Sequence, residues 1–87
     1  MSGTLVLGFI AASCSTLAFL PQVIKTWRTR STGDISLMTF LTIAVGSVLW
    51  VVYGWLEEDP PVLVTNAIIF VLASIILWLK LRYSSQT

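Results

Sequence analysis

Three long apolar runs dominate the chain, and every acidic or basic side chain lies outside them. The runs cover residues 4–24, 37–56 and 62–79. A transmembrane helix needs about 17–25 mostly apolar residues to cross about 30 Å of hydrocarbon. Each run therefore predicts one membrane-spanning helix.

The segments outside the runs differ in charge. The first connection (25–36) and the tail (80–87) hold all five basic side chains, whereas the second connection (57–61) holds three of the four acidic ones. Because basic residues are retained on the cytoplasmic side, this pattern predicts an outside N-terminus and a cytoplasmic C-terminus. Positive charge follows the first run and does not precede it, so we expect this run to remain as a helix and not to be removed as a signal peptide.

The two connections also contain turn signals. The sequence EEDPP predicts a tight turn between antiparallel helices, with Pro60 and Pro61 in the first turn of the third helix, where their missing N–H groups cost nothing. The sequence STGD predicts a turn before the second helix, with either Asp34 or Ser36 as its N-cap.

Composition agrees with a membrane protein. The chain has 87 residues, of which 56% are hydrophobic and 10% charged, whereas a soluble domain carries about 25% charged residues. We predict one all-α unit over residues 1–87, a multi-pass protein of the inner (plasma) membrane.

With no histidine and one cysteine, the sequence offers no metal site, no cofactor site and no nucleophile–base pair, so an enzyme is not expected. The net charge of +1 argues against a nucleic-acid partner.

Two polar or amphipathic residues lie deep inside the spans. Trp50 is six residues from the end of the second run, or about 9 Å, and Asn66 is four residues into the third, or about 6 Å. Gly46 and Tyr53 share the face of Trp50 at helical spacing. An indole, free space and an amide at similar depth predict a small pocket suited to a polyhydroxylated ligand. The alternatives are an interhelical hydrogen bond for Asn66 and close helix packing at Gly46.

The Pro21–Gln22 pair lies at the end of the first run. Pro21 has no N–H, so the carbonyl of Leu17 loses its helical partner, and Gln22 is near enough to help satisfy freed backbone groups. The pair predicts a bend that acts as a hinge during transport, or alternatively a static kink that shapes the bundle.

Two stretches resemble a known family. FLPQVIKTWRTRSTGDIS (residues 19–36) resembles the PQ-loop signature, and SVLWVVYGWLEEDPPVLVTNAIIF (residues 47–70) is similar to bacterial SemiSWEET sugar transporters. The resemblance covers essentially the whole chain. It implies a half-transporter whose third helix packs between the first and second, and whose two parallel protomers share one pathway on a two-fold axis. Independently, three helices are too few to surround a path wide enough for a hexose, and a shared orientation favours a parallel homodimer.

The resemblance also implies roles for single residues. They are substrate binding by Trp50 and Asn66, an outer gate of Tyr53 and Asp59, a hinge at Pro21 with Gln22, and an inner gate of Met38 and Phe40. Some members carry an arginine where Glu57 stands. An Arg–Asp closure is therefore not expected here, and hydrogen bonds between tyrosine and aspartate across the axis are expected instead.

The expected function is facilitative transport, or uniport, of small mono- or disaccharides by alternating access. Because the spans contain no Asp, Glu, Lys, Arg or His, no group is evident for carrying a coupled proton. Two alternatives stay open: a PQ-loop carrier for another small metabolite such as an amino acid, and a membrane interaction subunit that does not transport. The expected partners are a sugar, a second copy of the chain and the lipid bilayer.

Overall fold

The computed structural model describes residues 2–83, which form three helices. They are α1 (Gly3–Thr29), α2 (Leu37–Leu56) and α3 (Pro60–Tyr83). All three are long and apolar enough to cross a membrane, and each contains one of the three predicted apolar runs. Helix α1 continues past the apolar run and ends where Arg30 adopts a left-handed conformation with φ of 58°.

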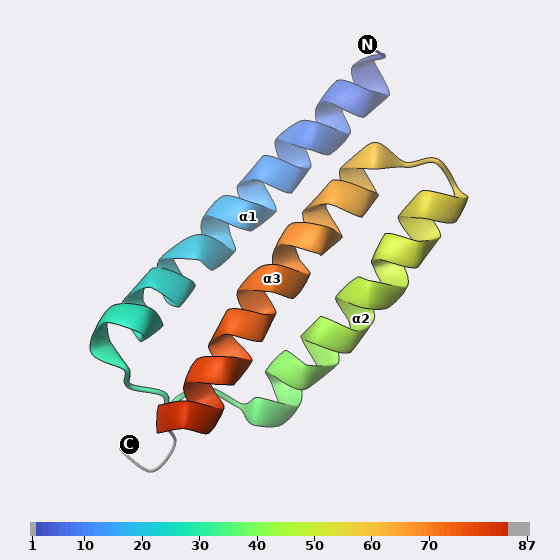
Figure 1. Cartoon of the computed structure of the whole chain (residues 1–87). Coiled ribbons are helices and arrows are strands. Elements are labelled where there is room, and N and C mark those ends of the chain that lie inside the picture. Colours follow the sequence, from blue (N-terminus) through green and yellow to red (C-terminus); the bar gives the residue numbers. More distant parts are fainter. Residues whose placement is uncertain (1, 84–87) are drawn as a thin grey trace.

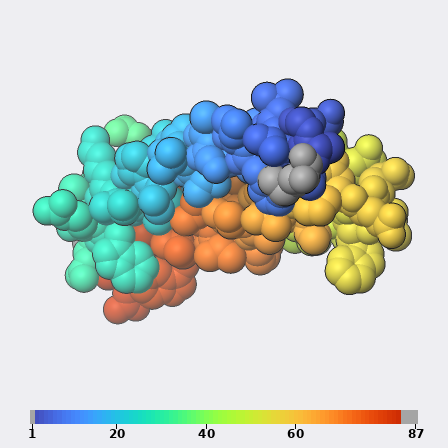
Figure 2. Space-filling view, turned by 90° about the horizontal axis from the view of Figure 1, so that it is seen from above, coloured from blue at the N-terminus to red at the C-terminus, as the bar shows by residue number. Residues whose placement is uncertain are grey.

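Helix α3 lies between α1 and α2 and packs against both (Figure 1), as the family resemblance implied. The N-terminus and the α2–α3 turn lie at one end of the bundle, and the α1–α2 loop and the end of α3 lie at the other (Figure 1). Figure 2 shows α1 lying along α3, with the α2–α3 turn protruding at one end. We call the end with residues 57–59 the acidic end and the other the basic end.

The core of the chain lies toward the basic end. Val23, Leu72 and Ile76 are buried together there, with Phe19 and Phe40 packed against them. The rings of Phe19 and Phe40 meet edge to face, with centroids 5.9 Å apart and planes at 76°. This arrangement of aromatic rings is favourable beyond the area that it buries, and it ties α1 to α2 across the core.

The α1–α2 loop is held against the end of α3. The Lys80 ammonium donates a hydrogen bond to the Thr32 carbonyl at 2.8 Å, and Thr32 is fully buried. The hydroxyl of Ser36 accepts from the N–H of Thr39 at 3.2 Å. Of the two predicted N-caps for α2, the structure therefore selects Ser36.

Candidate functional site

The α2–α3 turn at the acidic end is short and is held by backbone hydrogen bonds. The Asp59 N–H donates to the Gly54 carbonyl at 2.8 Å, and the Glu57 N–H donates to the Tyr53 carbonyl at 2.9 Å. Glu58 between them has a φ of 53°. Gly54 is buried against Leu63, and a Cβ at position 54 would lie 2.8 Å from the Leu63 nitrogen. Only glycine allows the two backbones to approach this closely.

Asp59 is the N-cap of α3. Its side chain accepts a hydrogen bond from the Val62 N–H at 3.3 Å, and its carbonyl accepts one from Leu63 at 3.0 Å. Pro60 and Pro61 follow in the first turn, as predicted. This capping role of Asp59 was not predicted, although an aspartate directly before prolines is a recognised start signal for a helix.

Tyr53, the other residue of the predicted outer gate, packs on α2 and not on Asp59. Its ring meets that of Trp50 edge to face, with centroids 5.2 Å apart and planes at 78°. Within residues 2–83, Tyr53 and Asp59 form no hydrogen bond with each other. The gate that the resemblance implies across a two-fold axis therefore stays a prediction.

Trp50 lies in a shallow hollow on the surface of α2. The hollow has a volume of about 270 Å³ and is lined by Gly46, Leu49, Trp50 and Tyr53. Trp50 is 52% exposed and Tyr53 is 49% exposed. A Cβ added at Gly46 would meet nothing within 4 Å. Close helix packing, the alternative for Gly46, is thus not seen within the described residues 2–83.

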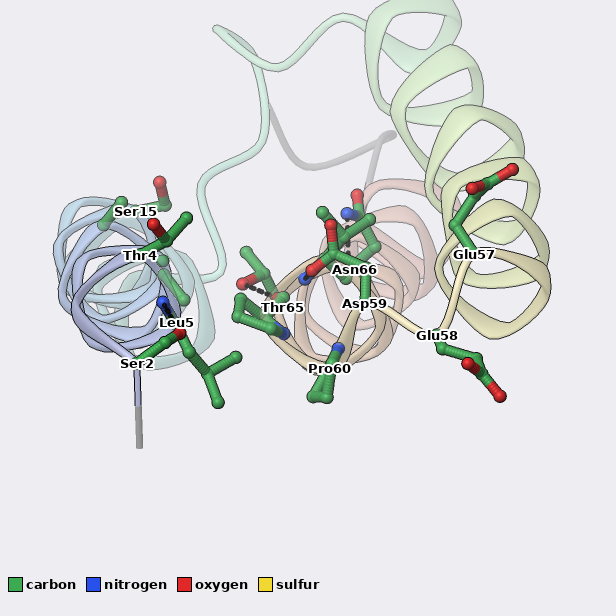
Figure 3. A pocket seen from close by; sticks show the side chains of 15 residues that line it. Ser2, Thr4, Leu5, Ser15, Glu57, Glu58, Asp59, Pro60, Thr65 and Asn66 are labelled. Carbon is green, nitrogen blue, oxygen red and sulfur yellow. Dashed lines mark hydrogen bonds between the residues drawn. The ribbon is translucent and has the colours of Figure 1, made fainter.

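Asn66 lines a different hollow, a groove of about 580 Å³ between α1 and α3. Its side-chain N–H donates a hydrogen bond to the Val62 carbonyl of its own helix at 2.9 Å. This bond lies within α3 and is therefore not the interhelical hydrogen bond that was the alternative interpretation of Asn66. Figure 3 shows the groove from the acidic end, with Ser15 on α1 and Asn66 on α3 pointing toward the same side of the bundle. The carbonyl oxygen of Asn66 is left as an acceptor for another group.

The floor of the Asn66 groove is set by a close approach of α1 and α3. A Cβ at Gly8 would lie 2.8 Å from the Pro61 ring. Ala11, Ala12 and Ser15 continue this strip of small residues along the groove. Small residues let two helices approach closely, and here they leave space beside Asn66. Within the single chain, Trp50 and Asn66 thus line separate hollows.

Pro21 and Gln22 lie inside α1, which remains helical on both sides of them. Both side chains are exposed. The Gln22 carbonyl accepts a hydrogen bond from the Thr26 hydroxyl at 2.8 Å. The predicted hinge is therefore placed on an exposed face of the helix, and its motion stays a prediction.

The two residues of the predicted inner gate differ in their surroundings. Met38 is 71% exposed at the start of α2. Phe40 packs against Phe19 and the core, so it holds the bundle together in this structure. Among residues 2–83, no group of three or more His, Cys, Asp or Glu side chains is placed to hold a metal ion.

Comparison with known proteins gives consistent matches. A family model described as PQ loop repeat matches residues 4–63. The chain is 49% identical to the "Sugar transporter SemiSWEET" of Bradyrhizobium diazoefficiens over 88% of this chain and 90% of the relative. It is 40% identical to the protein of the same name from Leptospira biflexa, over 93% and 95%. A crystal structure of SemiSWEET in the inward-open conformation superimposes with a TM-score of 0.90 at 36% identity, covering 99% of this chain and 92% of the other.

Proposed function

Because this chain belongs to the PQ-loop family, within which it is similar over nearly its whole length to SemiSWEET proteins, we propose that it transports small sugars. It is an integral multi-pass protein of the plasma membrane. The observation that carries the proposal is the likeness to named sugar transporters, at up to 49% identity in the matches above, together with the shared fold. The names of the relatives favour a sugar over an amino acid and transport over a purely structural role.

The working unit that we propose is a parallel homodimer with its N-termini outside. The hollow at Trp50 holds about 270 Å³, less than the roughly 300–1,000 Å³ of typical small-ligand sites. It is also open on the surface of α2, so one protomer offers half of a site. A second copy related by a two-fold axis would supply the other half and bring two sets of Trp50 and Asn66 to one pathway.

Within this pathway, Trp50 and Asn66 would share the recognition of the sugar. The exposed indole offers a flat apolar face for the C–H groups of a sugar ring. The free carbonyl oxygen of Asn66 accepts from a sugar hydroxyl, and its second N–H donates to another. Tyr53 beside Trp50 would steady the indole and supply the outer gate with Asp59.

Transport would proceed by alternating access. One solved relative is inward-open, and a transporter with an inward-open state requires a further state closed on that side. A bend at Pro21 would move the inner third of α1, which carries Val23, against the core around Phe19 and Phe40, with Met38 completing the inner gate. The spans hold no group for proton coupling, which favours uniport.

The test is uptake of a panel of labelled mono- and disaccharides, with amino acids alongside, into proteoliposomes of the purified protein. We expect uptake of at least one sugar above that of empty liposomes, saturable and driven only by its own gradient. Uptake of amino acids with no uptake of any sugar would overturn the proposal.

A further inference from the structure

The five basic side chains at the basic end fall into two groups, those with a partner within the described part of the chain and those without. Arg30 and Arg82 lie over aromatic rings at 5.2 and 5.7 Å, and Lys80 donates to a backbone carbonyl. Lys25 and Arg28 are both exposed. Within residues 2–83, neither of their side chains makes a hydrogen bond, an ion pair or a cation–π contact. Two positive charges on α1 are thus left for a partner outside the protomer.

These two side chains lie at one end of a groove along α1. The groove has a volume of about 580 Å³. Its apolar part is lined by Leu17, Leu20, Pro21 and Ile24, and its polar end by Lys25, Arg28 and Thr29. The change from apolar to basic follows the helix axis toward the basic end.

The length of the groove matches one leaflet of a bilayer. From Leu17 to Arg28, the helix rises about 16 Å at 1.5 Å per residue. Half of the hydrocarbon core is about 15 Å thick. A lipid beside α1 would therefore place an acyl chain on the apolar part and its phosphate level with the two cations.

We propose that this groove is a binding site for one anionic phospholipid of the adjoining leaflet. Its phosphate contacts Lys25 and Arg28, and the planar guanidinium of Arg28 can donate two parallel hydrogen bonds to it. Basic pockets at the cytoplasmic side of membrane helices recognise anionic headgroups in this way. The proposal rests on the membrane assignment and not on sugar transport, and its test reads lipid binding directly.

The test is native mass spectrometry of the purified protein in detergent, titrated with phosphatidylglycerol or with phosphatidylcholine. The variant K25Q/R28Q removes both free cations. The variant R30Q/R82Q is the matched control, because it removes two positive charges from the same end but outside the groove. The variant L17W keeps every charge and fills the apolar part.

We expect the wild-type protein to prefer phosphatidylglycerol. Each cation should contribute about fivefold in affinity. K25Q/R28Q should therefore lower the affinity for phosphatidylglycerol about twenty-five-fold, and R30Q/R82Q should change it less than about threefold. L17W should weaken binding of both lipids. Equal losses in the two double variants would show a diffuse charge effect and overturn the site, as would a wild type without preference or an L17W variant that binds like wild type.

Discussion

Two glycines of α2, Gly54 and Gly46, occupy opposite environments and allow a matched pair of substitutions. In Gly54→Ala, the new Cβ would lie 2.8 Å from the nitrogen and 3.1 Å from the Cα of Leu63. In Gly46→Ala, the new Cβ would meet nothing within 4 Å. The first change therefore forces two helices apart, and the second does not.

The magnitudes follow from this contrast. Overpacking costs about 1–3 kcal/mol, and we expect the upper part of the range at Gly54 because backbone atoms have no rotamer with which to move away. Replacing glycine by alanine inside a helix gains about 1 kcal/mol. The net effect is a loss of about 2 kcal/mol for Gly54→Ala and a gain of up to about 1 kcal/mol for Gly46→Ala.

The assay pairs unfolding in detergent, followed by helical circular dichroism, with sugar uptake in proteoliposomes. Gly54→Ala should unfold at a lower temperature than wild type. Gly46→Ala should be at least as stable as wild type, yet transport less, because its methyl group occupies the hollow beside Trp50. A Gly54→Ala variant as stable as wild type would refute the packing argument, and normal uptake by Gly46→Ala would show that the hollow is not used.

Three further predictions separate structural roles from transport roles. Asp59→Ala should lose about 1 kcal/mol of unfolding free energy through the lost N-cap, whereas Asp59→Asn, which still caps, should stay within about 0.5 kcal/mol of wild type; equal stability of the two variants in the same unfolding assay would contradict the capping role. Pro21→Ala restores a donor for the Leu17 carbonyl and should raise stability while lowering the uptake rate more than the sugar affinity; unchanged uptake would leave only a static kink. Counterflow should persist with an ionophore present and equal pH on both sides, and accumulation driven by an imposed pH gradient would exclude uniport.

The sequence predicted the helices well because their limits depend on local signals. The bounds of α2 coincide with the apolar run of residues 37–56, since Ser36 caps one end and EEDPP closes the other. Helix α1 runs beyond its apolar limit because Lys25 to Thr29 are compatible with a helix in water as well, so hydropathy marks the membrane and not the end of the helix.

The candidate site was less accessible to sequence reasoning. Rise per residue gives the depth of Trp50 and Asn66, but the direction in which each side chain points depends on how α3 packs between α1 and α2. That packing places Asn66 in the α1–α3 groove and Trp50 on the open face of α2. The capping role of Asp59 was readable from the two prolines that follow it, whereas the close approach of Gly54 to Leu63 required the packed backbones.

Sugar recognition by Trp50 and Asn66 is tested most directly by measuring sugar uptake by Trp50→Ala and Asn66→Ala, with Trp55→Ala as the control. Trp55 is an exposed tryptophan at the end of the same helix as Trp50. Stacking and hydrogen bonding are each worth about 1 kcal/mol, and each substitution changes both copies in a dimer, so uptake at low sugar concentration should fall about thirtyfold. Both variants should show this loss with folding intact, and Trp55→Ala should keep near-normal uptake. Wild-type uptake by both Trp50→Ala and Asn66→Ala would show that these two side chains do not bind the sugar.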